Sequence, residues 1–213
     1  MSKRLIIMGA PGAGKGTMGA IIIKMLNIPQ VSTGNILREA IHNGTEMGLK
    51  AKDAIDSGKF VSDDIVIGIV KDKLASDECK NGFLLDGFPR TTAQAEALDT
   101  MTEIDAVIDL QTPEELIKAR LSGRRVCPKC GATYHIVNIP PKKEGVCDEC
   151  SSELIIRKDD VPETIDERLR AYHESTEPLE SFYENKGVLK KILCDNDIDA
   201  TTERIKIALE SCV

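Results

Sequence analysis

Residues 4–17 read RLIIMGAPGAGKGT, and the predicted fold follows from this stretch. The apolar run at residues 4–8 is short and ends at glycine, which is typical of a buried strand in a parallel sheet. A helical pattern follows the glycines over residues 15–26, with Met18, Ile22 and Met25 among its apolar positions. The sequence therefore predicts a strand, a glycine-rich loop and a helix that follow one another directly.

The loop at residues 9–15 fits the pattern G-x-x-x-x-G-K, with Gly16 next and Thr17 one step later. Glycines let the backbone turn its N–H groups towards phosphate oxygens, and the helix start adds a dipole that favours anions. Lys15 offers a positive charge to the outer phosphates, and the Thr17 hydroxyl follows close behind it. A glycine-rich turn with an unrelated lysine is the alternative, which the order of strand, loop and helix disfavours. The loop indicates a nucleoside triphosphate site and leaves the reaction open.

Short apolar runs and helical patterns alternate along the rest of the chain. The expected strands are residues 28–31, 82–85, 104–110 and 188–193. The expected helices are two short ones within 34–58, one after a cap at 62–64, and those at 91–98, 112–123, 162–184 and 202–211. Such alternation predicts an α/β fold, a parallel sheet with helices on both faces. Residues 126–160 interrupt the pattern with four cysteines and little apolar content, so we expect a small separate insertion.

The four clustered cysteines have the spacing C-x2-C-x16-C-x2-C and are Cys127, Cys130, Cys147 and Cys150. This spacing is typical of a four-thiolate zinc site, with iron as the alternative metal. Redox pairs or inert thiols are the metal-free alternatives. Because the segment is too poor in apolar residues to fold alone, a bound metal would supply its stability. Four ligands leave no open coordination position, so the predicted role is structural.

Composition excludes several classes of protein. The chain has 213 residues, of which 41% are apolar and 30% charged, so neither a membrane-spanning nor a disordered chain is expected. A net charge of −7 and an aromatic content of 3% disfavour a nucleic-acid partner. We interpret the start MSKRLIIM as the first strand and not as an export signal. Cys79, Cys194 and Cys212 are then expected to be small core residues without chemistry.

Six motifs in order resemble the adenylate kinases, in the long-lid form whose lid carries zinc. The motifs are GAPGAGKGT (9–17), STGNILR (32–38), DGFPRT (86–91), GRRVCPKC (123–130), RKDD (157–160) and ERL-x-x-Y (167–172). The resemblance runs from the first strand to at least residue 190. It implies reversible phosphoryl transfer from Mg-ATP to AMP, giving two ADP, by a cytoplasmic monomer that maintains the balance of adenine nucleotides.

The resemblance also implies an architecture. This is the P-loop nucleoside-monophosphate kinase fold, with a five-stranded parallel sheet flanked by helices, a helical insert and a small zinc-containing β lid. The core domain would comprise residues 1–31, 62–126 and 165–213. The helical insert that binds the nucleoside monophosphate would be residues 32–61, and the lid would be residues 127–164.

Residue roles follow from the same resemblance. It implies that ATP binds Gly12, Ala13, Gly14, Lys15, Gly16, Thr17, Arg120, Arg124, Thr133, Tyr134 and Asn196. It implies that AMP binds Thr33, Arg38, Lys59, Phe60, Val61, Gly87, Phe88, Pro89, Arg90, Gln94, Arg157 and Arg168, with Gln94 on the adenine edge. The catalytic cations would be Lys15, Arg90, Arg124, Arg157 and Arg168, and Asp86 would orient water on Mg²⁺.

Two positions depart from the family pattern. Asn35 stands where the family usually has Asp, which leaves the role of that carboxylate unfilled. The family usually has a glycine in the loop beside the ATP adenine, whereas residues 193–197 contain none. Asn196 is our candidate for that contact.

A set of cations without a nucleophile suits phosphoryl transfer, because that reaction needs alignment and charge neutralisation rather than covalent help. Arginine is well suited, since its planar group pairs two oxygens at once. A UMP or CMP kinase would share the loop and the DGFPR motif, but Thr33, Gln94 and the long lid favour AMP. A zinc-ribbon nucleic-acid-binding NTPase is disfavoured by the acidic charge, and a regulatory protein without turnover is disfavoured by the complete set of cations.

Overall fold

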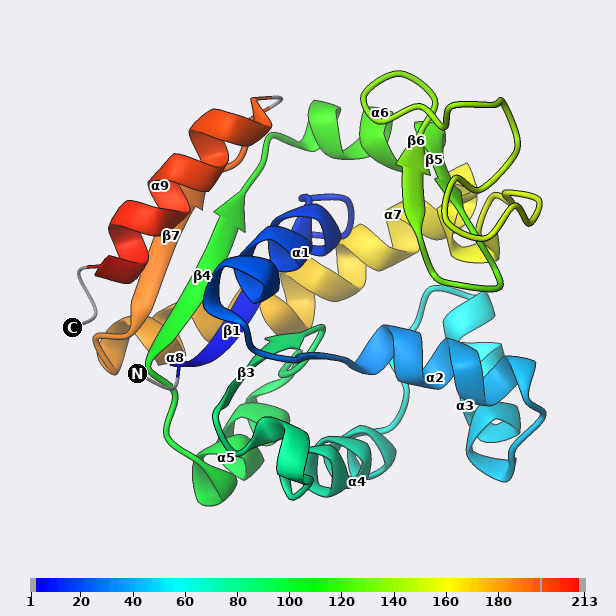
Figure 1. The fold of residues 1–213 in the computed structure, drawn as a ribbon. Helices are drawn as coiled ribbons and strands as arrows, with labels where there is room; N and C mark the ends of the chain where they lie inside the picture. Colours follow the sequence, from blue (N-terminus) through cyan, green and yellow to red (C-terminus); the bar gives the residue numbers. More distant parts are fainter. Residues whose placement is uncertain (1–2, 196, 211–213) are drawn as a thin grey trace.

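A five-stranded parallel sheet with the strand order β2-β3-β1-β4-β7 forms the centre of the molecule (Figure 1). The computed structural model describes residues 3–195 and 197–210. The strands are β1 (Lys3–Gly9), β2 (Gln30–Ser32), β3 (Gly82–Asp86), β4 (Ala106–Gln111) and β7 (Leu189–Leu193). Every pair of neighbours is parallel, and β1 lies between β3 and β4. The predicted fold class is confirmed.

Helices cover both faces because successive side chains of each strand point to opposite sides. Leu5 and Ile7 of β1 face α1 (Lys15–Leu26) and α9 (Ile198–Glu210). Ile6 and Met8 face the other side. The helices there are α4 (Asp63–Leu74), α5 (Thr92–Met101) and α8 (Leu179–Asn185). All four β1 residues are buried, so the strand is apolar on both faces, as its unbroken apolar run predicted.

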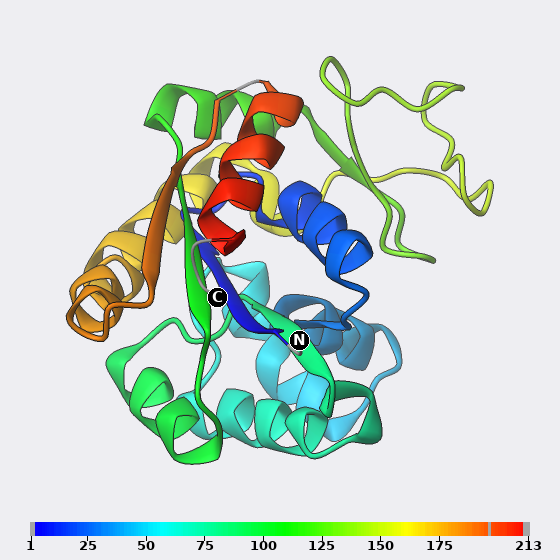
Figure 2. The same ribbon diagram turned by 60° about the vertical axis from the view of Figure 1, so that its left-hand side comes forward.

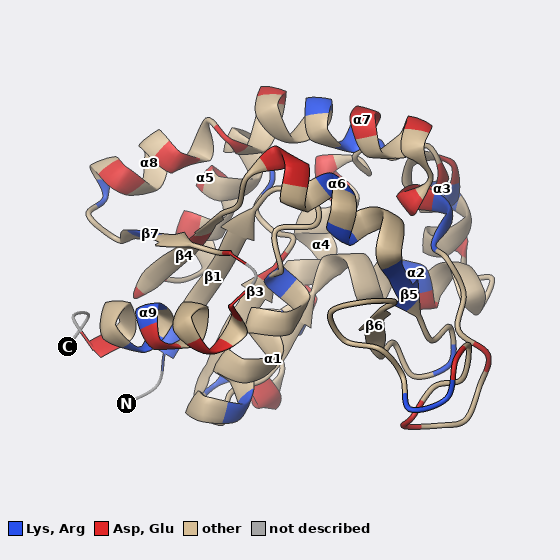
Figure 3. Cartoon of the chain, turned by 90° about the horizontal axis from the view of Figure 1, so that it is seen from above, with Lys and Arg blue, Asp and Glu red and all other residues tan. Residues whose placement is uncertain are grey.

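Two further helices cover the end of the sheet. α6 (Glu114–Gly123) and α7 (Pro162–Ala171) pack together through Ile117, Leu121, Ile165 and Leu169, against Ala10 of the glycine-rich loop. Acidic and basic residues both occur along α7 and α9 (Figure 3). Within the described residues, no helix is both long and apolar enough to cross a membrane.

The single helix predicted over residues 162–184 is wrong. The chain forms α7, then a π-helical turn at Tyr172–Thr176, then α8. Glu177 N donates to Tyr172 O at 2.9 Å, five residues back, which is the hydrogen bond of a π-helix. Pro178 follows directly, and proline lacks the N–H that would continue the α-helical ladder. Two other elements differ in their ends. β2 covers Gln30–Ser32 where we expected 28–31, and α9 covers Ile198–Glu210 where we expected 202–211.

Two segments extend beyond the sheet and its helices. α2 (Thr33–His42) and α3 (Glu46–Asp56) form a helical pair between β2 and α4. Residues 127–156, which we name the cysteine segment, follow β5 (Arg124–Val126) and contain β6 (Thr133–His135), the antiparallel partner of β5. This segment projects away from the sheet (Figure 2). Short 3-10 turns at Asp77–Cys79 and Lys158–Asp160 complete the described structure.

Candidate active site

A cavity of about 790 Å³ opens at the carboxyl ends of the central strands. It is bounded by the glycine-rich loop, the α2–α3 pair, the loop after β3 and the cysteine segment. Of the residues expected at the site, those that line it are Gly12, Gly14, Lys15, Gly16, Thr17, Thr33, Arg38, Lys59, Phe60, Val61, Asp86, Gly87, Pro89, Arg90, Gln94, Arg120, Arg124, Thr133, Tyr134, Arg157 and Arg168. One cavity therefore brings together residues that lie as far apart in the chain as Gly12 and Arg168.

Three expected residues do not line the cavity or cannot be placed. Phe88 is buried in the apolar core next to Leu85 and Leu98. Ala13 belongs to the glycine-rich loop, but its side chain is buried in the core. Asn196 lies outside the described residues.

Lys15 begins α1, directly after Gly14, which has a left-handed φ of 105°. The Lys15 Nζ donates to the carbonyls of Gly9 at 2.6 Å and Ala10 at 2.8 Å. Burial, which is the largest cause, and the charges of nearby arginines together lower the pKa of Lys15 to about 8, against the opposing charge of Asp86. The site thus holds a cation whose charge is poorly compensated, which is the condition for binding an anion.

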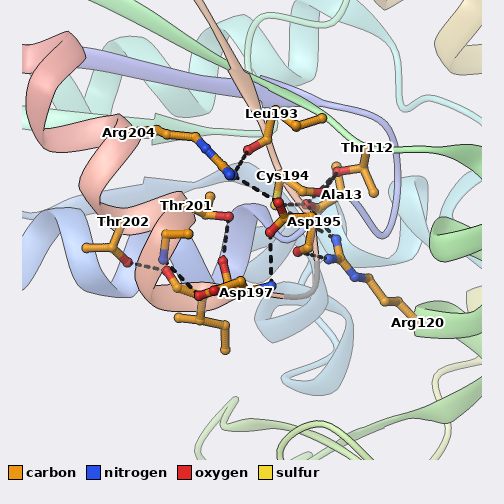
Figure 4. Close-up of polar contacts among 12 residues, drawn as sticks. Ala13, Thr112, Arg120, Leu193, Cys194, Asp195, Asp197, Thr201, Thr202 and Arg204 are labelled. Carbon is orange, nitrogen blue, oxygen red and sulfur yellow. Dashed lines mark hydrogen bonds and ion pairs between the residues drawn. The ribbon is translucent and has the colours of Figure 1, made fainter.

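The Ala13 carbonyl is the point at which the glycine-rich loop is held (Figure 4). Thr112 Oγ1 lies 3.2 Å from it, Arg120 Nη1 3.2 Å and Cys194 Sγ 3.1 Å. These contacts keep the carbonyl on the outer side of the loop, so that the following amides are free to face the cavity. Arg120 also donates to the Asp195 carbonyl, which joins α6 to the end of β7. Thr112 and Cys194 were not expected at the site.

Two acids hold Arg124 and Arg168 in place on the cavity lining. Asp160 is buried and pairs with both Arg124 and Arg168, with 2.7 Å from Arg124 Nε and 2.8 Å from Arg168 Nη1. Asp159 Oδ2 lies 3.0 Å from Arg168 Nη1. Burial opposes the ionisation of Asp159, but the surrounding arginines outweigh it and lower its pKa. Both acids come from the RKDD motif, yet their role as partners of these arginines was not predicted.

Arg157 and Arg90 face like charges. Burial and the guanidinium groups of Arg38 and Arg124 lower the pKa of Arg157. Burial and Arg168 lower the pKa of Arg90 in the same way. Because arginine keeps its proton at neutral pH, such crowding stores repulsion that a bound polyanion relieves.

The turn after β3 is built around the Gly87 carbonyl. Thr33 Oγ1 donates to it at 2.9 Å, and Arg90 Nε donates to it at 2.9 Å. The Phe88–Pro89 peptide bond is cis. The Arg90 guanidinium lies 5.3 Å from the centre of the Phe60 ring, which lines the same part of the cavity.

Asp86 ends β3 and faces the cavity near Lys15. It accepts hydrogen bonds from Gln30 Nε2 at 3.1 Å and Ser32 Oγ at 3.4 Å. On the neighbouring helix, Asn35 Oδ1 accepts from Arg38 Nη2 at 2.8 Å. The asparagine therefore orients Arg38 without adding the negative charge that a carboxylate would bring.

The four clustered cysteines come together at the base of the cysteine segment. Their sulfur atoms all lie within 4.8 Å of one another, with Cys127–Cys150 at 3.3 Å and Cys130–Cys147 at 3.5 Å. A tetrahedral zinc ion with Zn–S bonds of about 2.3 Å sets its sulfurs about 3.8 Å apart, so the donor set and its size fit.

The two C-x2-C turns have matching backbone geometry. Gly131 N donates to Cys127 O at 3.0 Å, and Ser151 N donates to Cys147 O at 2.9 Å. Both donors have left-handed φ angles, 77° and 59°. Two equivalent turns that converge on one point are the arrangement a four-thiolate metal site requires. Tyr134 bridges this site and the cavity, since its hydroxyl lies 3.5 Å from Cys147 Sγ.

The remaining cysteines are only in part what we expected. Cys79 is buried in the core, as predicted. Cys194 is buried too, but it also contacts the glycine-rich loop and lines the cavity. Cys212 lies outside the described residues.

Comparison with known proteins agrees with these observations. The family model described as adenylate kinase matches residues 7–188. The adenylate kinases of Caldicellulosiruptor bescii and Caldicellulosiruptor saccharolyticus are each 52% identical to the chain, covering 97% of it and 98% of their own length. That of Archaeoglobus fulgidus is 49% identical over 97% of both chains. A match of this extent, on a chain with this cavity, shows that the protein belongs to the adenylate kinase family.

Proposed function

We propose that the protein transfers the terminal phosphoryl group of Mg-ATP to AMP, giving two ADP, and so maintains the balance of adenine nucleotides. The observation that carries this proposal is the convergence of Lys15 and six arginines on one cavity. The arginines are Arg38, Arg90, Arg120, Arg124, Arg157 and Arg168. Positive groups held in place lower the barrier to phosphoryl transfer because the charge on the transferred group is neutralised without reorganisation.

ATP would occupy the side of the cavity formed by the glycine-rich loop. Its phosphates would accept from the loop amides and from Lys15, which would exchange its two carbonyl partners for phosphate oxygens. The adenosine would lie towards Arg120, Thr133 and Tyr134. AMP would occupy the side formed by α2, α3 and the turn after β3, with its phosphate near Arg38 and Arg90.

Mg²⁺ would accompany ATP. Asp86, with Thr17 nearby on the cavity lining, provides the oxygen donors that this ion prefers. When bound, the ion would neutralise charge on the outer phosphates. Asp86 is oriented for this by Gln30 and Ser32, whose side chains hold one of its oxygens.

Zn²⁺ is the metal we propose for Cys127, Cys130, Cys147 and Cys150, because four thiolates in a tetrahedral arrangement fit it. We further propose that residues 127–164 act as a lid that closes over ATP and keeps water out. Residues 32–61 would form the unit that binds AMP. The core would be residues 1–31, 62–126 and 165–213.

A monomer in the cytoplasm is the form we propose. One chain supplies Lys15 and the arginines on which the proposed reaction depends, which supports a monomer. Gel filtration coupled to light scattering tests this, and a stable dimer would contradict it.

A coupled assay of ADP formation tests the reaction. With Mg-ATP in excess and AMP, UMP, CMP or GMP as acceptor, we expect AMP to be used far better than the others. Absence of ADP with AMP would overturn the proposal, and a clear preference for UMP or CMP would reassign the acceptor.

A further inference from the structure

The Gln94 side chain is held at both ends of its carboxamide. The residue is 1% exposed and lines the AMP side of the cavity. Its Oε1 accepts from the Arg90 backbone N–H at 2.8 Å, and its Nε2 donates to Asp63 Oδ1 at 2.6 Å. Each end therefore makes one hydrogen bond inside the protein and has one more to offer a ligand.

Asp63, the first residue of α4, belongs to a closed set of contacts between α4 and α5. Its other oxygen, Oδ2, accepts from Thr91 Oγ1 at 3.0 Å. The Thr91 hydroxyl in turn accepts from Gln94 N at 3.2 Å and caps α5. Because Thr91 and Gln94 hold both of its oxygens, the Asp63 carboxylate cannot rotate without breaking a bond.

These partners permit only one orientation of the Gln94 carboxamide. An ionised carboxylate accepts hydrogen bonds and never donates, whereas a backbone N–H donates and never accepts. Rotating the carboxamide by half a turn would place Oε1 against the Asp63 carboxylate and the amide nitrogen against the Arg90 N–H. Both hydrogen bonds would become repulsive contacts between buried polar groups, which is costly.

The orientation matters because a glutamine side chain that could rotate would form hydrogen bonds equally well with a 6-amino purine and with a 6-oxo purine. Adenine offers an amino donor at position 6 and an acceptor at N1, which match the free Oε1 lone pair and the free Nε2 hydrogen. Guanine and hypoxanthine offer an oxygen at position 6 and a hydrogen on N1, which match only the rotated carboxamide. Cytosine carries the adenine-like pattern and uracil the guanine-like one.

We propose that Asp63 is a positioning residue that fixes the Gln94 carboxamide and thereby selects nucleoside monophosphates with an amino group over those with an oxo group. The inference rests on the proposed function, in which the AMP base lies against Gln94. Asp63 itself contacts no nucleotide, and its effect passes through Gln94.

The Asp63→Asn variant tests this directly. Its amide can turn either end towards Gln94, which removes the repulsion against the rotated carboxamide while keeping the size of the side chain. We expect the ratio of kcat/KM for AMP to kcat/KM for inosine monophosphate to fall roughly tenfold, since one hydrogen bond to a charged group no longer discriminates. The Arg90 N–H still favours the original orientation, so some preference for AMP remains.

Asp64→Asn is the matched control. Asp64 lies in the same turn of α4 and carries the same charge, but its side chain is exposed. We expect this variant to keep the wild-type ratio. If Asp63→Asn lowers kcat/KM for both acceptors equally, so that the ratio is unchanged, Asp63 only supports the fold and the inference is wrong.

A second measurement needs no variant. The wild-type protein should use CMP better than UMP, although both pyrimidines fill the site poorly. Equal use of the two would contradict the inference. Failure of the proposed function has a different signature, because the wild-type protein would then make no ADP from AMP at all.

Discussion

The core side of the cavity and the cysteine segment differ in how much apolar surface they bury. The core side, formed by the glycine-rich loop and the ends of β1, β3 and β4, rests on fully buried residues such as Leu5, Leu85 and Ile108. The cysteine segment has a buried cluster of four residues, two of them cysteines, while Val137 and Ile156 are more than half exposed. The core side is therefore stabilised by apolar burial. The cysteine segment has little apolar burial, so we expect it to depend on the proposed metal.

This difference leads us to expect a core side that moves little and a cysteine segment that moves as one unit, as the proposed lid requires. The chain enters and leaves the cysteine segment beside the ion pair between Arg124 and the buried acid Asp160. The arginines that both nucleotides would share thus lie where the two units meet.

Removing the proposed metal is the strongest test of the difference between the core side and the cysteine segment. Structural zinc contributes on the order of 10 kcal/mol to the folding of small zinc domains. We expect a strong chelator to speed amide hydrogen exchange over residues 127–156 and to lower the melting temperature, while β1 and β4 stay protected. Unchanged melting and unchanged exchange after verified loss of metal would contradict the dependence on metal.

Lys15→Met addresses the core side, where we expect a chemical group to be removable without loss of structure. Turnover should fall by about a hundredfold to a thousandfold, the cost of one charge-stabilising group at a transition state. The melting temperature should stay within a few degrees of wild type, because burial lowers the pKa of Lys15 and its charge does not stabilise the fold. Substantial remaining turnover in a steady-state assay would contradict the role assigned to Lys15.

Leu85→Ala weakens the packing of the core side and leaves its charged groups in place, the reverse of Lys15→Met. Leu85 is fully buried, so its truncation should lower the free energy of unfolding by roughly 3 kcal/mol. Bound metal, measured by elemental analysis, should remain at the wild-type ratio. Leu49→Ala, at a residue 63% exposed, is the control and should change stability by less than about 0.5 kcal/mol. Loss of metal from Leu85→Ala would show that the two sides are not independent.

The pH profile gives the smallest expected effect. The pKa of Lys15 is lowered to about 8 in the free protein, so the charge that attracts ATP is lost as the pH rises through that value. We expect kcat/KM for ATP to decline above about pH 8, with kcat declining only at higher pH because bound phosphate favours the protonated amine. Lys15→Arg retains its proton throughout this range and should lack this decline, whatever its activity.

Local sequence patterns, with the family resemblance that they carry, predicted most of the fold and most of the expected residues that line the cavity. The glycine-rich loop, the DGFPR turn and the two C-x2-C turns each lie within a few residues, so backbone geometry and ligand spacing are visible in the sequence. Alternating strands and helices predicted the parallel sheet for the same reason. Pro178 was visible as well, but the π-helical turn before it was not predicted.

Contacts between distant residues escaped prediction. Thr112 and Cys194 reach the Ala13 carbonyl from 99 and 181 positions away. Asp160 lies 36 positions from Arg124. Asp63 lies 31 positions from Gln94 and outside every quoted motif.

The sheet, the strand–loop–helix order at the glycine-rich loop and the grouping of the four cysteines could be predicted from the amino-acid order alone. Strand burial, glycine geometry and thiol spacing are local properties. The pairing of acids with arginines and the direction of the Gln94 carboxamide emerged only in the folded chain. Those choices depend on donors and acceptors that meet across the fold, and a buried polar group must find its partner there because water cannot supply one.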